Sequence, residues 1–157
     1  MEITKIDFHD LGLLRTLQHN GRATISELAE TVRLSPTPVA RRLGMLEDAG
    51  VITGYTALIA EAALGYGFSA FVSVKMDRQV DDVLAEFEAT IRNFPEVVDC
   101  WLMTGHRDYL LRISTRGPDD FEQFMTGTFN RLPGVASIES TIPLRRVKAD
   151  HMRRIER

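Results

Sequence analysis

Apolar positions in residues 21–50 recur at the spacing of two amphipathic helices joined by a short turn. Thr24 and Glu27 form a threonine-x-x-glutamate capping box, which predicts a helix start with two backbone donors satisfied. After the turn, Ser35 is a favoured N-cap and Pro36 suits the first helical position, where its missing N–H costs nothing. Two capped helices in such close succession are typical of a helix-turn-helix, the motif that places its second helix in the DNA major groove.

The second of these helices has two distinct faces. Val39, Leu43 and Leu46 fall at positions i, i+4 and i+7 and predict a buried stripe, and Gly50 suits the left-handed conformation that ends a helix. The opposite face, near the N-terminal half of the helix, is the part that reaches base edges in such motifs. The residues expected to contact DNA are Ser35, Thr37, Pro38, Ala40, Arg41 and Arg42.

The local charge agrees with this interpretation. Residues 33–46 include three arginines and no acid, although the whole chain has 19 Lys+Arg against 22 Asp+Glu and a net charge of -3. Arg41 is expected at a base edge, and Arg42, which lies nearer the buried stripe, at a backbone phosphate. The alternative that charge spacing leaves open is an ordinary helical hairpin whose arginines form a solvated face.

From residue 68 onward, alternating segments are separated by helical ones. Strands are expected at residues 68–76, 97–104, 108–115 and 134–144, with a helix in each of the two longer intervals. The order β-α-β-β-α-β is the ferredoxin-like plan. One face of such a sheet is left without helices, and a homodimer is the simplest way to cover its apolar side chains. Before these strands, residues 55–59 alternate like a short linking strand, and a small helical turn or loop follows.

Composition narrows the class of protein. A chain of 157 residues with 44% hydrophobic and 26% charged residues can bury a real core. Its apolar runs are far shorter than the roughly 20 residues that span a bilayer, and its start lacks the pattern of a signal peptide, so we expect a cytoplasmic protein with no membrane partner. Cys100 is the only cysteine, which excludes an intrachain disulfide and a multi-cysteine zinc site.

Between Ile6 and about Lys148 the chain resembles the Lrp/AsnC (leucine-responsive and asparagine-responsive, or feast/famine) regulators of bacteria and archaea. The matching motifs occur in order along the chain. They are Ile6-Asp7-x-x-Asp10-x-x-Leu13-Leu14, Asn20-Gly21-Arg22, Leu34-Ser35-Pro36 with Arg41-Arg42, Leu46-Glu47-x-x-Gly50-Val51-Ile52, Pro95-Glu96-Val97, Thr104-Gly105-x-x-Asp108-Tyr109, Leu132-Pro133-Gly134-Val135 and Val147-Lys148.

The resemblance implies a transcription regulator that binds double-stranded DNA, forms a homodimer that assembles into a tetramer or octamer, and responds to a small amino acid without any cofactor. The effector would lie at the turn between two strands, where backbone N–H groups meet its carboxylate and Asp108 accepts from its ammonium. Carried onto this chain, the effector site comprises Leu102, Met103, Thr104, Gly105, His106 and Asp108, with Ser140 or Thr141 from a neighbouring subunit. From spacing alone, the same glycine and aspartate also fit an ordinary hairpin turn.

These patterns together predict an α+β chain. Residues 1–53 are expected to form a winged-helix-like helix-turn-helix domain, and residues 54–67 a linker strand and loop. Residues 68–148 are expected to form a ferredoxin-like domain for effector binding and dimerisation, and residues 149–157 a basic C-terminal tail.

Two other classes of protein compete with a DNA-binding regulator. One is a ligand-sensing module whose helix-turn-helix contacts a protein. The other is a small dimeric enzyme with His106 and Asp108 as acid and base. The enzyme is disfavoured, because the four histidines are not spaced as metal ligands and no serine lies in a nucleophile-elbow pattern.

Overall fold

The computed structural model describes residues 6–78, 80–148 and 155. The chain divides into two compact units. One unit consists of residues Met1–Leu58 together with a C-terminal segment that begins at Lys148, and the other of Ile59–Val147. In the first unit, the guanidinium of Arg15 donates to the carbonyl oxygen of Ile155 at 2.9 Å. Apart from Ile155, the predicted tail of residues 149–157 lies outside the described residues.

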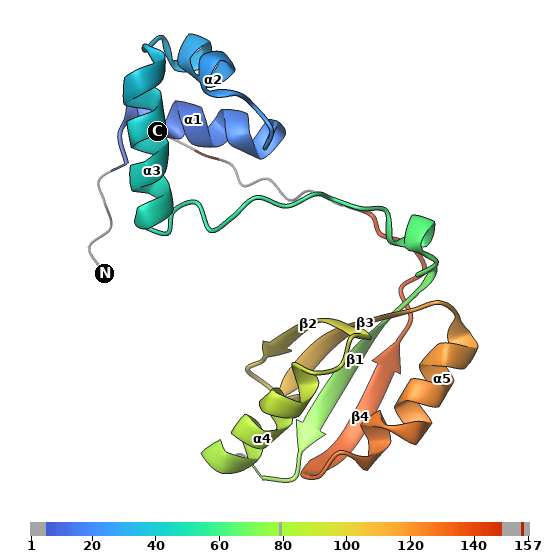
Figure 1. Cartoon of the computed structure of the whole chain (residues 1–157). Helices are drawn as coiled ribbons and strands as arrows, with labels where there is room; N and C mark the ends of the chain where they lie inside the picture. Colours follow the sequence, from blue (N-terminus) through green and yellow to red (C-terminus); the bar gives the residue numbers. More distant parts are fainter. Residues whose placement is uncertain (1–5, 79, 149–154, 156–157) are drawn as a thin grey trace. The chain divides into compact units, whose positions relative to one another are not determined.

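The described residues of the N-terminal unit form three helices, α1 (Phe8–His19), α2 (Ile25–Val32) and α3 (Pro36–Asp48) (Figure 1). They enclose an apolar core because each helix buries the stripe that its spacing predicts. The buried members of this core are Leu13, Leu28, Ala29, Val32, Val39 and Leu43.

The caps explain where α2 and α3 begin. At α2, Thr24 accepts from the backbone N–H of Glu27 and Glu27 accepts from that of Thr24, so the predicted capping box is confirmed. Ser35 occupies the N-cap of α3, but its hydroxyl makes no capping hydrogen bond, and Pro36 reduces the number of free donors there. Gly50 follows the end of α3 with φ +68°, the left-handed conformation expected for it.

The C-terminal unit is a four-stranded antiparallel sheet with two helices. The strands are β1 (Phe68–Met76), β2 (Val97–Leu102), β3 (Tyr109–Thr115) and β4 (Val135–Thr141), in the spatial order β2-β3-β1-β4. The helices are α4 (Asp81–Ile91) and α5 (Pro118–Gly127), and the short 3-10 helices are η1 (Glu61–Leu64) and η2 (Phe129–Arg131). The chain order β-α-β-β-α-β confirms the ferredoxin-like prediction.

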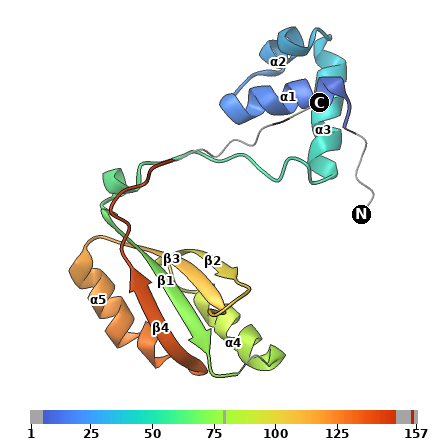
Figure 2. The ribbon, with the colours of Figure 1, turned by 180° about the vertical axis from the view of Figure 1, so that it is seen from behind.

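Both α-helices lie on one face of the sheet, and the opposite face, called here the open face, carries no α-helix of the described residues (Figures 1 and 2). Every second residue of β1 is buried under the helices, as alternation requires. Phe87 and Ile91 of α4 and Phe124 and Met125 of α5 pack on this buried face. The side chains that alternate with the buried ones therefore define the open face.

β1 has the predicted bounds, the other three strands are shorter than alternation predicts, and the predicted linking strand is absent. β2 ends at Leu102 and β4 at Thr141, where the last residue pair with β1 is Phe71 with Thr141. Residues 55–59 form no strand. Alternation marks the side that each residue faces, but a strand also needs a partner backbone, and residues 55–59 pair with none of the described strands.

Gly134 sits in a crowded left-handed turn and Gly65 in an open one. Their φ angles are +77° and +86°. A Cβ on Gly134 would lie 2.7 Å from Cγ1 of Val83, whereas a Cβ on Gly65 would meet nothing within 4 Å. Alanine substitutions at the two positions therefore distinguish the energetic cost of backbone strain from that of steric crowding.

We expect Gly65→Ala to lower the free energy of unfolding by about 1–2 kcal/mol through left-handed strain alone. Gly134→Ala should cost roughly 1–3 kcal/mol more, because Val83 must move. Urea unfolding followed by the fluorescence of Trp101, the single tryptophan, reports on this unit alone. Equal losses in the two variants would show that the contact with Val83 relaxes without cost.

Candidate DNA-binding and effector sites

The six predicted DNA contacts lie at the start and along one side of α3. Ser35, Thr37, Ala40 and Arg41 are exposed, and Pro38 and Arg42 are partly buried. The stripe Val39, Leu43 and Leu46 is buried, as predicted. This division leaves a polar surface along α3 that another molecule can reach.

The two neighbouring arginines have different surroundings. Arg41 forms no ion pair with a described residue. The Arg42 guanidinium instead contacts Oδ2 of Asp7 at 2.7 Å and Oδ1 of Asp10 at 2.8 Å. The hydrogen bonds that Arg42 donates to Asp10 and Asp7 raise the pKa of Arg42 above its usual value. The predicted contact of Arg42 with a phosphate would have to replace these two carboxylates.

The predicted effector turn is the connection between β2 and β3. Leu102 ends β2, and Met103, Thr104, Gly105 and His106 are all exposed. Gly105 adopts φ +112°, a conformation that side chains disfavour, and a Cβ there would meet nothing within 4 Å. The backbone closes the turn through a hydrogen bond of 2.8 Å from the N–H of Met103 to the carbonyl oxygen of Asp108. The turn is thus a defined hairpin with an open outer surface.

Asp108 has surroundings unlike those of its neighbours in the turn. It is only 3% exposed. Its Oδ2 accepts from the backbone N–H of Met76 at 2.7 Å, and its Oδ1 contacts Nζ of Lys75 at 3.1 Å. The carboxylate expected to meet an effector ammonium therefore ties the turn to the end of β1.

Ser140 and Thr141 lie far from the turn within one chain. They belong to β4 and pair with Val72 and Phe71 on one side of β1. Leu102, by contrast, pairs with Tyr109 on the opposite edge of the sheet. Because β3 pairs Tyr109 with Val74, the turn also lies toward the other end of β1. The sheet separates the two halves of the predicted site within one chain.

Arg107 is a turn residue that the sequence reasoning missed. Its guanidinium donates to Oγ of Ser137 at 2.8 Å and to Oε2 of Glu139 at 2.7 Å. These contacts reach over β1 to β4, because Ser137 pairs with Lys75 of β1. No local sequence signal links residues 30 or more positions apart, so only the fold reveals this contact.

A second charged cluster on the open face was also missed. Nε of Arg112 contacts Asp99 at 3.0 Å, and its NH1 contacts Glu61 at 2.9 Å. Glu61 also accepts from the hydroxyl of Ser114. The hydrogen bond from Arg112 is the main cause that lowers the pKa of Glu61. This cluster joins η1 to the open face of β2 and β3.

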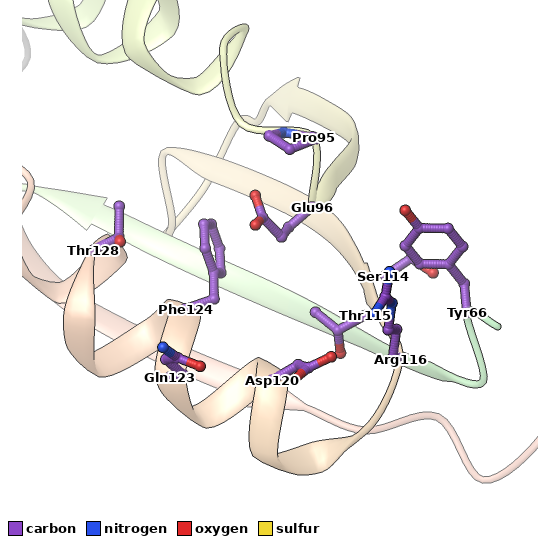
Figure 3. A pocket seen from close by; sticks show the side chains of 10 residues that line it. All are labelled: Tyr66, Pro95, Glu96, Ser114, Thr115, Arg116, Asp120, Gln123, Phe124 and Thr128. Atoms are coloured by element: carbon purple, nitrogen blue, oxygen red, sulfur yellow. The ribbon is translucent and has the colours of Figure 1, made fainter.

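The described residues of the C-terminal unit line at least two cavities. One, of about 390 Å³, lies where α5 and the α4–β2 connection meet the end of β3 (Figure 3). None of the eight predicted effector residues lines it. Its lining residues are Tyr66, Pro95, Glu96, Ser114, Thr115, Arg116, Asp120, Gln123, Phe124 and Thr128.

The second cavity, of about 370 Å³, lies beside β2 and includes Leu102 of the predicted site. Two of its other lining groups are Cys100 and Tyr109. Burial raises the pKa of the Cys100 thiol to about 11, and the hydroxyl of Tyr109 hydrogen-bonds Glu88 at 3.0 Å. Both groups therefore remain protonated near neutral pH.

Two other kinds of site find no support in the described residues. No group of three or more His, Cys, Asp and Glu side chains among them could hold a metal ion. No helix in the described ranges is both long and apolar enough to cross a bilayer.

A three-helix unit with an exposed arginine on its last helix, joined to a ferredoxin-like unit, defines a helix-turn-helix protein with a second, α+β domain. Residues 7–53 match the family model for a winged helix-turn-helix DNA-binding domain. Residues 69–152 match that for the Lrp/AsnC ligand-binding domain. The chain belongs to the Lrp/AsnC family and is a DNA-binding transcription regulator.

Other proteins are similar to this chain in sequence and structure over almost its whole length. The Bkd operon transcriptional regulator of Pseudomonas aeruginosa is 40% identical over 145 residues, covering 92% of this chain and 95% of its own. A transcriptional regulator of Neisseria meningitidis, solved as a complex with L-Met, has a TM-score of 0.88 and 37% identity, covering 94% of this chain and 95% of that one. AsnC of Escherichia coli has a TM-score of 0.83 and 27% identity, covering 97% and 99%. The first two of these proteins are named as transcriptional regulators.

We expect Asp108→Ala to lower the free energy of unfolding by about 1–3 kcal/mol, because the buried N–H of Met76 loses its acceptor. Asp108→Asn should cost less, since its amide oxygen can still accept from Met76 and the pair with the half-exposed Lys75 is worth about 0–1 kcal/mol. Trp101 fluorescence during urea unfolding measures both. If both variants are as stable as the parent, Asp108 does not hold the turn.

Proposed function

We propose that this regulator recognises a specific operator in the cytoplasm through α3 and that a small amino acid modulates its DNA binding or assembly. Operator recognition draws its main support from Arg41, an exposed guanidinium without an ion-pair partner among the described residues. An arginine on a recognition helix can donate two hydrogen bonds to the edge of guanine. Ser35, Thr37, Pro38 and Ala40 would border it on the same surface.

The overall charge of the chain is compatible with this proposal. The net charge is -3. Phosphate contacts depend on where positive charges lie and not on their sum, so a locally basic surface is sufficient. An acidic remainder would weaken non-specific binding and thereby favour discrimination between operators.

We expect Arg41→Ala to weaken operator binding by about 5- to 150-fold while changing binding to scrambled DNA much less, because a bidentate base contact is worth roughly 1–3 kcal/mol. Fluorescence anisotropy at fixed salt, with both DNAs, measures the ratio. Arg41→Lys is the matched control, since it keeps the charge but loses the planar fork, and should restore scrambled binding without restoring discrimination.

An unchanged ratio of operator binding to scrambled-DNA binding in Arg41→Ala would show that Arg41 does not contact base edges. If the parent protein binds neither DNA but still takes up an amino acid, it acts as a sensing module for a protein partner.

The proposed effector site is shared between subunits. Leu102, Met103, Thr104, Gly105 and His106 of one subunit would face Ser140 and Thr141 of another. This arrangement is supported by the separation of the turn from β4 within one chain. The backbone N–H groups of the turn suit the effector carboxylate, and the hydroxyls of Ser140 and Thr141 suit its ammonium. Asp108 would keep the turn in place and leave direct contact to these groups.

The turn also indicates which amino acids would fit. Leu102 and Met103 are 61% and 44% exposed, an apolar surface beside the polar backbone of the turn. The Neisseria relative was solved with L-Met, an amino acid with an apolar side chain. We therefore favour an effector whose side chain is apolar.

A homodimer through the open face would make sharing of this kind possible. Trp101, at 45% exposed, projects from β2 on that face, and Phe71 and Leu110 are partly buried on the same face. Covering apolar side chains is the main gain of such an interface. Further assembly of dimers into a tetramer or octamer would bring additional turns and β4 strands together.

Mixing two inactive variants tests whether subunits share the site. Thr104→Arg should block the turn half and Ser140→Arg the β4 half, each abolishing effector binding alone. In a mixed dimer, one site carries both changes and the other carries neither, so a random mixture should regain about one quarter of the sites. Calorimetry with a panel of amino acids, on co-refolded protein, counts the sites.

If mixing restores nothing although each variant still dimerises by size-exclusion chromatography, the effector site lies within a single chain. If either variant alone binds like the parent, its half does not contribute.

A further inference from the structure

The N-terminus of α1 is capped by two aspartates in a reciprocal arrangement. Oδ1 of Asp7 accepts from the backbone N–H of Asp10 at 3.0 Å, and Oδ2 of Asp10 accepts from that of Asp7 at 3.0 Å. This capping box satisfies two donors that a helix start leaves unpaired. It uses one oxygen of each carboxylate and leaves the other oxygen of each available.

Both remaining oxygens contact Arg42 of α3. Oδ2 of Asp7 lies 2.7 Å, and Oδ1 of Asp10 2.8 Å, from the same guanidinium nitrogen. The backbone N–H of Asp10 is the main cause that lowers the pKa of Asp7, and Arg42 lowers it further. All four carboxylate oxygens are therefore engaged, two within α1 and two across to the recognition helix.

The side chain of Asp7 is 44% exposed, but the burial of Asp10 makes its contact with Arg42 more than a surface ion pair. The side chain of Asp10 is 11% exposed and that of Arg42 24%. A charge this far from water needs a partner, because breaking a buried pair leaves an uncompensated charge. Asp10 and Arg42 are 32 residues apart in sequence, so the pair fixes α3 against α1.

We propose that Asp7 and Asp10 form a carboxylate clamp that holds Arg42 as a positioning residue for α3 and keeps it from contacting a DNA phosphate. Arg41 is the adjacent residue on the same helix, about 100° further round its axis. A rotation or shift of α3 that follows release of Arg42 moves Arg41 relative to the base edges. The clamp thereby acts on operator discrimination through Arg41. This inference rests on operator recognition through α3.

Salt dependence distinguishes a positioning residue from a phosphate contact. The logarithm of the DNA-binding constant falls with the logarithm of salt concentration by about 0.9 for each phosphate contact. We expect Arg42→Gln to leave this slope unchanged and to lower the ratio of operator to scrambled binding by about tenfold, within the range of coupling between contacting residues. Arg42→Lys, which can still contact both aspartates, should recover part of the ratio.

A double variant tests the route through Arg41. In an Arg41→Ala background, Arg42→Gln should change the ratio by less than about twofold, because the group that the clamp positions is gone. Asp10→Asn should reproduce the loss of discrimination caused by Arg42→Gln. Far-UV circular dichroism confirms that each protein is folded at the temperature of the assay. If Arg42→Gln does not fold, Asp7→Asn, which retains a capping acceptor, should give a smaller loss of discrimination at unchanged slope.

A slope that falls by about 0.9 in Arg42→Gln would identify Arg42 as a phosphate contact and overturn the clamp. An unchanged slope with unchanged discrimination would reduce the clamp to a stabilising contact and also overturn the proposal. Failure of the parent protein to prefer any operator would instead contradict operator recognition itself, which keeps the two failures separate.

Discussion

The C-terminal unit depends on the burial of one face of β1. Ala70, Val72, Val74 and Met76 are almost fully covered, and β1 lies between β3 and β4, so each neighbouring strand must match its alternation. A shift of one residue would turn these side chains to the open face and bring Lys75 under the helices. Register is therefore strongly specified. The same register sets which residues the open face presents and separates the β2–β3 turn from Ser140 and Thr141.

Charged side chains lie at positions outside the apolar cores. Asp108 meets Lys75 and a backbone N–H at the end of β1, and Arg42 meets two carboxylates beside the first helix. In both cases an aspartate that is nearly covered lies within ion-pair distance of a cation. Such pairs add little net stability compared with apolar packing, but they are costly to break and so define one arrangement. Their effect is to fix the outer surfaces, the turn in one unit and α3 in the other.

The sequence predicted the features that depend on near neighbours. The capping box of Thr24 and Glu27, the start of α3 at Pro36 and the left-handed Gly50 all follow from interactions within a few residues, and β1 has the bounds that alternation predicts. Features that depend on distant residues were not predictable in this way. Residues 55–59 alternate like a strand but pair with no described strand. The surroundings of Arg42 and Asp108 are set by residues 32 or more positions away, so spacing could mark both as polar sites without revealing that other side chains already engage them.

Whether a polar side chain already has a partner within the chain changes how the α3 surface and the β2–β3 turn are interpreted. A polar residue in a motif is a candidate contact, but a ligand must then compete with any partner inside the chain. Arg41, without an ion-pair partner in the described residues, faces no such competition, whereas Arg42 would exchange two close carboxylates for one phosphate. The same reasoning applies to the turn, where the exposed backbone around Gly105 is open to a ligand and the carboxylate of Asp108 is not. Binding is thus expected at groups that the fold leaves open, and the engaged charges beside them hold those groups in position.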